Sequence, residues 1–420
     1  MERKEVKIVI GSNFGDEGKG LMADYFCRQF LKNGQRAITV MSNGGAQRGH
    51  TVVTPTGERH VFKHFASGTF ALSDTYYPEN FILNPMEFCR ELKQIVQSRS
   101  IKTGRTRILL DGCSRAPACF ANAKCKWSTP YDVILNQIVE ECREEKRHGS
   151  CGMGIWETIA RHNSYLYPYT FQEFCHLKEK DQISYLKSIR DEYFIDRLNR
   201  YGIPSVPPEW KSVVYSPELI EHFLSDVNTM AKNICFDYDY EPLTRYNSIV
   251  FENGQGLLLD QNMTLFENNT TPSNTGCWEP VMIIGKAFGK CNLNDKKNKS
   301  VPPISIELCY VTRTYVTRHG AGRFDEECSK DTLNPNMNDK TNVTNPFQGV
   351  LRYGELNPAG LQYRIRRDLN NMAFCHFPWK AGIALTHTDE YSCDLSGMDI
   401  PVRYYSDGET SNNVHALTRY

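Results

Sequence analysis

The segment Val6-Lys7-Ile8-Val9-Ile10, followed by Gly11-Ser-Asn-Phe-Gly-Asp-Glu-Gly-Lys-Gly20, decides the fold. Its first part is a short β-branched run, which is typical of a buried parallel strand. The glycine-rich part comes next, and residues 21–31 then carry apolar side chains at helical spacing. Residues 37–40, Ala-Ile-Thr-Val, form a second strand-like run. The order of strand, glycine loop, helix and strand predicts a βαβ unit at the start of the chain.

Later segments continue this alternation. Strands are predicted at residues 107–110, 248–251, 304–312 and 383–386, and an amphipathic helix at residues 131–147. Two polar stretches, residues 292–303 and 330–349, have no apolar period and predict loops, the second of them mobile. We find no internal repeat and no interdomain linker, so we expect one α/β domain over residues 1–420 with a central, mostly parallel sheet.

The composition restricts the kind of protein. Lys plus Arg and Asp plus Glu both total 49, so the formal net charge is zero and gives no support for a nucleic-acid-binding surface. The chain has no long apolar run and no leader-like start, which predicts a cytoplasmic protein without a membrane segment. Its 15 cysteines have no C-x-x-C pair, so we expect reduced thiols rather than a disulfide framework or a zinc site.

The loop Gly15-Asp-Glu-Gly-Lys-Gly20 between a strand and a helix predicts an anion site, because backbone N–H groups are free at a helix N-terminus. Lys19 adds a positive charge. The spacing differs from a Walker A motif, since Asn13 stands where that motif has its first glycine. The loop also contains two carboxylates, Asp16 and Glu17. Because a carboxylate beside phosphate lowers the affinity for phosphate, we expect a carboxylate there to act as a magnesium ligand, a general base or both. A solvated turn is the alternative.

A second glycine-rich loop, residues 44–51, follows the second predicted strand and ends in Gly49-His50-Thr51. Its flexible backbone can place His50 near the first loop. Since histidine titrates near neutrality, His50 suits proton donation there.

These two loops together resemble adenylosuccinate synthetase, a family with a G-D-E-G-K-G segment near the N-terminus and an N-A-G-H-T segment about thirty residues later. The similarity continues in order along nearly the whole chain. The matching segments are His64-Phe-Ala-Ser-Gly68, Gly149-Ser-Cys-Gly-Met-Gly-Ile155, Phe251-Glu-Asn-Gly-Gln-Gly-Leu-Leu-Leu-Asp260, Thr271-Pro-Ser-Asn-Thr275, Thr317-Arg-His-Gly-Ala-Gly-Arg-Phe324 and Leu385-Thr-His-Thr-Asp389.

The resemblance implies a P-loop-like fold and a ligase that joins L-aspartate to IMP at the cost of GTP. It implies that Asp16 takes the N1 proton of the purine and binds Mg²⁺ together with the carbonyl of Gly49. His50 would stabilise the phosphate transferred to the 6-oxygen, and Gln255 would contact the purine. The GTP phosphates would be held by Gly15, Glu17, Gly18, Lys19, Gly20, Gly49 and Thr51.

The remaining implied contacts fall into three groups. Guanine would be read by His387, Asp389, Ser406 and Gly408. The purine monophosphate would be bound by Gln47, Ser150, Cys151, Arg161 and Thr271, with Arg161 reaching across the interface of a homodimer. The amine substrate would be held by His319, Gly320 and Arg352.

Departures from the family pattern concentrate on the amine side. Val350 and Leu351 stand where arginines are expected. Either aspartate binds differently, through Arg323, Arg364 or His319, or the donor is another amine. His387 replaces a lysine of the guanine-reading segment, which leaves GTP or another nucleoside triphosphate open. The region 390–420 is shorter than in bacterial members. The alternatives are a ligase for a modified or deoxy purine monophosphate such as dGMP, and a non-catalytic nucleotide-binding regulator.

Overall fold

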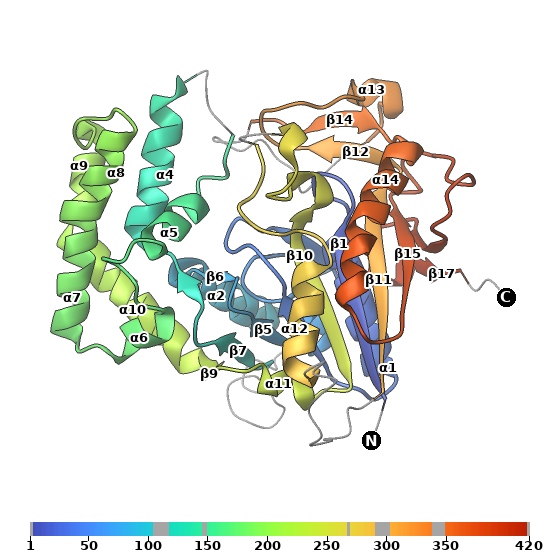
Figure 1. Cartoon of the computed structure of the whole chain (residues 1–420), viewed down its shortest axis with the longest axis horizontal. Coiled ribbons are helices and arrows are strands. Elements are labelled where there is room, and N and C mark those ends of the chain that lie inside the picture. Colours follow the sequence, from blue (N-terminus) through green and yellow to red (C-terminus); the bar gives the residue numbers. More distant parts are fainter. Residues whose placement is uncertain are drawn as a thin grey trace.

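The computed structural model describes residues 3–103, 117–144, 149–266, 269–289, 303–337 and 349–417. Its centre is a ten-stranded sheet in the order β17-β16-β15-β11-β1-β10-β2-β5-β7-β9 (Figure 1). All neighbouring strands are parallel except β16 and β17. The strands are β1 (Lys4–Gly11), β2 (Ala37–Met41), β5 (Asp74–Tyr77), β7 (Cys119–Asn122), β9 (Ile234–Asp237), β10 (Ser248–Gly256), β11 (Ile304–Arg313), β15 (Trp379–Thr386), β16 (Val402–Ser406) and β17 (Val414–Ala416).

Strand β1 lies near the middle of the sheet, paired with β10 and β11, and its side chains alternate between two cores. Val6, Ile8 and Ile10 pack against one layer, which contains α12 (Trp278–Phe288) and α14 (Pro358–Leu369). Val9 points to the opposite layer, which contains α1 (Lys19–Lys32). Helices therefore cover both faces, as a buried parallel sheet requires, and the predicted single α/β domain is confirmed.

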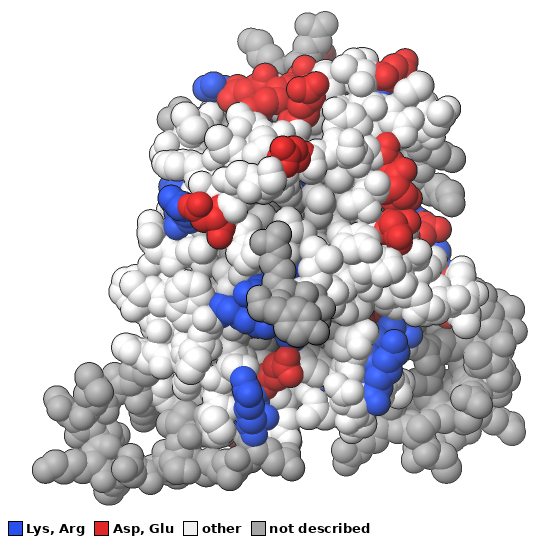
Figure 2. All heavy atoms as spheres, turned by 90° about the vertical axis from the view of Figure 1, so that its right-hand side faces the viewer, with Lys and Arg blue, Asp and Glu red and all other residues white. Residues whose placement is uncertain are grey.

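A helical subdomain, on the left of Figure 1, builds a third core around Trp127. Its helices are α2 (Pro85–Thr103), α4 (Pro130–Cys142), α5 (Ile155–His162), α6 (Phe171–His176), α7 (Glu179–Ser188), α8 (Phe194–Arg200), α9 (Pro208–Val214) and α10 (Pro217–Asn233). Within the described part of the chain, no helix is long and apolar enough to cross a membrane. Figure 2 shows acidic and basic side chains side by side on the face that carries the C-terminal strands.

Short strands complete the fold around the edge that carries the site. They are β3 (His50–Val53) with β4 (Arg59–Phe62), β6 (Ile82–Leu83) with β8 (Lys126–Trp127), and β12 (Tyr315–Arg318) with β14 (Arg352–Glu355) and β13 (Glu327–Cys328). The short helix α13 (Lys330–Leu333) follows β13, and another short helix, α11 (Glu241–Thr244), connects β9 to β10.

The structure confirms some of the predicted elements and corrects the extent of others. The strands expected at residues 248–251, 304–312 and 383–386 are confirmed as β10, β11 and β15. The helix expected over residues 131–147 already ends at Cys142. The polar stretch 330–349 was predicted wholly as loop, but its first residues form α13 because Ser329 caps the turn. The strand at 107–110, most of the loop at 292–303 and residues 338–348 lie outside the described residues.

Candidate active site

A single large cavity of about 1400 Å³ opens at the carboxyl ends of the central strands. The segments that follow β1, β2, β10, β11 and β15 all contribute to its wall. Loops meet there because parallel strands end at the same edge of a sheet, the usual ligand position in open α/β folds. The volume exceeds the roughly 300–1,000 Å³ of a site for one small molecule, so it can hold two substrates together.

The first glycine loop, residues 15–20, lines this cavity and leads into α1. Gly15, Asp16 and Gly18 all have positive φ angles, of 109°, 57° and 92°. Asp16 is the unusual member because a non-glycine residue rarely adopts this conformation. The Arg313 guanidinium donates a hydrogen bond to the Asp16 carbonyl oxygen and holds the backbone there.

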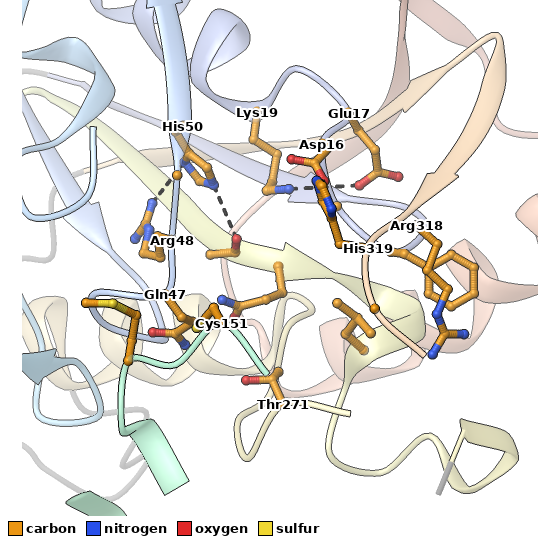
Figure 3. A pocket seen from close by; sticks show the side chains of 18 of the residues that line it. Asp16, Glu17, Lys19, Gln47, Arg48, His50, Cys151, Thr271, Arg318 and His319 are labelled. Carbon is orange, nitrogen blue, oxygen red and sulfur yellow. Dashed lines mark hydrogen bonds and ion pairs between the residues drawn. The ribbon is translucent and has the colours of Figure 1, made fainter. Parts of the chain in front are cut away.

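The Asp16 carboxylate faces the cavity and His319 (Figure 3). Its Oδ2 atom lies 3.6 Å from His319 Nε2, and both side chains are partly exposed. His319 and Gly320 follow β12, so the predicted amine-pocket residues and the predicted base share one wall of the cavity.

Glu17 and Lys19 form a buried pair under the loop, with Lys19 Nζ 3.9 Å from Glu17 Oε2. Burial lowers the pKa of Lys19, and the Glu17 charge opposes that change. Burial raises the pKa of Glu17 to about 7 against the opposing charge of Lys19. Because the Glu17 carboxylate accepts the backbone N–H of Asn13, its role is to fold the loop. The contact of Glu17 with the GTP phosphates stays a prediction, and it would be made by the backbone N–H of Glu17, since the carboxylate is turned to Asn13 and Lys19.

His50 begins β3 and lies beside Glu252 of β10 (Figure 3). Its Nδ1 atom contacts the Glu252 carboxylate, and its Nε2 atom lies 3.2 Å from the Gly254 carbonyl oxygen. Burial and the nearby Arg48 guanidinium lower the pKa of His50. Burial alone would raise the pKa of Glu252, but His50 and Arg48 outweigh it and lower that pKa to about 2. His50 is thus held by an ionised carboxylate.

A group of amide side chains lines the cavity beside His50. Gln255 accepts a hydrogen bond of 3.2 Å from Asn43, which also holds the backbone N–H of Gly254 at 2.7 Å. Among the described residues, neither amide atom of Gln47 has a hydrogen-bond partner although both are buried, and the same is true of the Thr51 hydroxyl. These groups can bind polar atoms of a ligand without breaking existing bonds.

Ser150, Cys151 and Thr271 also line the cavity. The Ser150 hydroxyl lies 3.0 Å from Asn136 Nδ2 on α4. Burial raises the pKa of Cys151, so this residue offers a neutral thiol, which is a weak hydrogen-bond donor.

The predicted base-reading residues lie at the other end of the cavity, after β15 and β16. His387 and Asp389 line the wall together with Gly408. His387 has a φ of 60°, and its ring nitrogen Nδ1 lies 2.9 Å from the Thr386 hydroxyl. Ser406 is buried behind the wall and donates a hydrogen bond of 2.7 Å to the Gly408 carbonyl, so it positions the turn instead of facing the ligand.

A comparison with known families adds a decisive observation. Residues 8–346 match the sequence model of adenylosuccinate synthetase. The chain belongs to the adenylosuccinate synthetase family. This family consists of carbon–nitrogen ligases, and the resemblance read from the motifs is confirmed.

Curated adenylosuccinate synthetases are distant relatives of this chain. The one from Lactobacillus acidophilus is 25% identical over 331 residues, and the one from Limosilactobacillus reuteri is 26% identical over 330 residues. Each of these alignments covers 77% of this chain and 65% of the relative. The chain therefore spans just under two thirds of the length of these curated relatives.

Solved structures extend the similarity of fold to almost the whole chain. Fully ligated adenylosuccinate synthetase from Plasmodium falciparum has a TM-score of 0.66 at 15% identity, with 98% of this chain and 99% of that chain covered. Succinoaminodeoxyadenylate synthetase of cyanophage S-2L, bound to dGMP and dATP, has a TM-score of 0.60 at 13% identity, with 99% and 96% covered. At these identities the likeness establishes the fold of the adenylosuccinate synthetase family.

Two arginines that the family resemblance placed in the site do not line the cavity. Arg161 is fully buried, bonded to Asp132 and to the Trp127 carbonyl, and stacked over the Trp127 ring at 5.2 Å. In this position Arg161 is engaged within its own chain, and the expected contact across a dimer interface stays a prediction. Arg352 forms a two-point pair with Glu327 and donates to the carbonyls of Gly320 and Gly322. These two hydrogen bonds hold the loop of the predicted amine pocket from outside the cavity.

Several residues around the reacting groups were not predicted. Arg48 is buried against His50 and Glu252, with its Nη2 atom 3.5 Å from the Glu252 carboxylate. Arg313 holds Asp16. Glu252 offered a signal, since it is a charged residue inside an otherwise apolar strand, and Arg48 lies within the second glycine loop. Their partners are distant in sequence, so the pattern alone could not pair them.

The residues around the first loop fit Mg²⁺. Asp16 and Gly49 both line the cavity, which gives a carboxylate and a backbone carbonyl. In the described ranges no three His, Cys, Asp or Glu side chains gather as a metal cage. Mg²⁺ typically uses one or two carboxylates together with substrate phosphates, so this sparse oxygen donor set suits it.

Glu17→Gln should change how the stability of the protein depends on pH. Because the pKa of Glu17 is raised to about 7 in the folded chain, its favourable contribution is complete below pH 4.5 and is lost as the pH rises through 7. With about 1.4 kcal/mol for a pKa difference of one, the loss is about 3 kcal/mol. Urea unfolding at pH 5 and pH 8 should therefore show a smaller decline in Glu17→Gln than in the wild type. The exposed Glu179 gives a control, Glu179→Gln, that should leave the decline unchanged.

Proposed function

We propose that this protein is a GTP-dependent ligase that phosphorylates the 6-oxygen of an IMP-like purine nucleotide and replaces it with the amine of L-aspartate. The observation that carries this proposal is the arrangement of Asp16, Lys19 and His50 around one cavity with room for two substrates. A base, a phosphate-binding cation and a group for the transferred phosphate are the parts that phosphoryl transfer needs.

In the first step, Asp16 accepts the N1 proton of the purine. The 6-oxygen then attacks the γ-phosphorus of the donor, the bond to the bridging oxygen breaks, and the nucleoside diphosphate leaves. Lys19 and the backbone N–H groups of the loop hold the donor phosphates. Bound Mg²⁺, held by Asp16 and the Gly49 carbonyl, would neutralise phosphate charge during this transfer.

In the second step, the amine attacks C6, the C6–O bond breaks, and inorganic phosphate leaves and takes up the proton that the amine nitrogen loses. Phosphorylation makes this possible because the unmodified 6-oxygen is a poor leaving group. His50 hydrogen-bonds the transferred phosphoryl group, while Glu252 holds the other side of its ring. Gln255 contacts the purine near the reacting edge.

The amine donor is the least constrained substrate. Arg352 is paired with Glu327, Arg323 is paired with Asp325, and Arg364 is bonded to the Ser12 carbonyl. None of these arginines is therefore ready to bind a carboxylate without giving up a bond. His319, which lines the cavity beside Asp16, is the residue that we expect nearest the amine.

A variant ligase is the second candidate. The neutral thiol of Cys151 and the imidazole of His387 favour a modified or deoxy purine monophosphate and a donor other than GTP. The fold neighbour from cyanophage S-2L was solved with dGMP and dATP, which makes these two nucleotides the obvious trial substrates. The family resemblance also supports a cytoplasmic homodimer, which sedimentation of the purified chain would test.

Phosphate release tests the proposal. The chain is incubated with GTP or ATP, with IMP or dGMP, and with or without L-aspartate, and the product is identified by mass. We expect release that requires a purine monophosphate and an amine. Turnover that does not depend on aspartate would indicate another amine. Absence of turnover with every purine acceptor would leave a nucleotide-binding regulator as the better account.

A further inference from the structure

The monophosphate end of the cavity needs a positive charge that the expected arginine does not provide. Ser150, Cys151, Gln47 and Thr271 line this end, and all four are neutral. Arg161 is committed to Asp132 in the interior. A phosphate dianion bound only by neutral groups is held weakly compared with one that has a charge-assisted bond. The following inference rests on the proposed function.

Other cations on the described cavity wall already have structural partners. Arg143 pairs with Glu140 at 2.8 Å and stacks on Tyr201. Arg59 pairs with Glu409 at the base-reading end. Four further cations of the wall each have an ion-pair or hydrogen-bond partner within the protein. They are Lys19, Arg48, Arg313 and Arg318.

Lys63 is the remaining lysine or arginine of the described wall. It follows β4, and its backbone N–H is fixed by the Glu91 carboxylate at 3.1 Å. The same carboxylate holds the N–H groups of His64 and Phe65. The backbone under Lys63 is therefore rigid, while its side chain is 28% exposed.

Among the described residues, the one ion pair that Lys63 forms is a long one that it can release. Its Nζ atom lies 3.4 Å from Glu87 Oε2, and Glu87 also pairs with Arg90. Glu87 would thus keep a partner if Lys63 turned to a ligand. Burial raises the pKa of Cys151, and the charge on Lys63 acts against that rise. The positive charge of Lys63 therefore acts on the part of the cavity where the monophosphate is expected.

We propose that Lys63 binds the 5′-phosphate of the purine monophosphate and takes the part that the family resemblance assigned to Arg161. Lys63, Ser150 and Cys151 line the same cavity, and the charge of Lys63 already acts on the Cys151 thiol. Turning from Glu87 into the cavity would bring the ammonium toward this pair. Lysine acts here as a compact point charge, which suits a phosphate that needs no two-point geometry.

Equilibrium binding of IMP, inosine and GTP to the full chain tests this inference. Lys63→Met should weaken binding of IMP by roughly 10- to 100-fold and leave inosine and GTP within about twofold. Lys63→Arg, which keeps the charge, should recover most of the affinity. Lys286→Met is the matched control, because Lys286 pairs with Glu79 and does not line the cavity. Thermal melting should be almost unchanged, since the pair with Glu87 is partly exposed.

The outcomes separate this inference from the proposed function. If the wild type binds neither IMP nor dGMP, the proposed function fails. If the wild type binds IMP and Lys63→Met binds it equally well, only the role of Lys63 is overturned. If GTP binding falls instead, Lys63 belongs to the donor end and the inference is also overturned.

Discussion

Asp16→Asn should lower the turnover of this protein by on the order of a thousandfold and leave its fold intact. The amide cannot accept the N1 proton, and loss of a general base typically costs about 10²–10⁴-fold. Asparagine tolerates a positive φ, so the backbone at 57° is preserved. Steady-state phosphate release, together with a thermal melt of the same sample, measures both effects.

Asp16→Ala provides the contrast to this substitution. Alanine loses the carboxylate and is also strained at the positive φ, so we expect the same loss of turnover with about 1 kcal/mol less stability. The exposed Asp325, which pairs with Arg323 outside the cavity, supplies the control Asp325→Asn. Turnover of Asp16→Asn near the wild-type rate would remove Asp16 from the mechanism.

Arg161→Met should destabilise the chain by about 3–5 kcal/mol, the usual cost of leaving one partner of a buried ion pair without the other. The effect is large because Asp132 is buried too and would keep its charge beside Trp127. Urea unfolding measures the loss. The KM for the purine monophosphate should change little in the fraction that remains folded.

An exposed pair gives the matched control for this second substitution. Arg200 pairs with Asp196 on α8 with both side chains more than half exposed, so Arg200→Met should cost less than about 1 kcal/mol. If Arg161→Met unfolds like the wild type and only its KM for the monophosphate rises, Arg161 is a nucleotide ligand and not a structural residue.

The central part of the fold and the first loop could be predicted because their signals are local. A β-branched run, glycines and a helical period within about thirty residues suffice for β1, the loop and α1. The loop must then meet the ligand, since β1 ends at the edge where parallel strands present their loops. The predicted positions of His50, Gln255 and His319 on the same wall follow from similar strand ends.

Residues whose role depends on a distant partner could not be predicted in this way. In the sequence, Arg161 is a basic residue of a short helix. Only the folded chain brings Asp132 and Trp127 into contact with it. In the sequence, Glu17 is a polar residue of the predicted phosphate loop. Its burial beside Lys19, which gives it a structural role, is visible only in the folded chain. Lys63 has no motif at all, and its place on the wall comes from the position of β4.

The central position of β1 also sets the order in which this protein can fold during synthesis. Residues 4–11 leave the ribosome long before their partners, which are residues 248–256 and 304–311. At about 5–20 residues per second, roughly 15 seconds to a minute pass before both neighbours exist. Such long-range pairing is intrinsically slow, and an apolar strand is exposed meanwhile. The phosphate loop is therefore made early but can be held in place only after β11 is made, which predicts that the nascent chain relies on chaperones until β11 emerges.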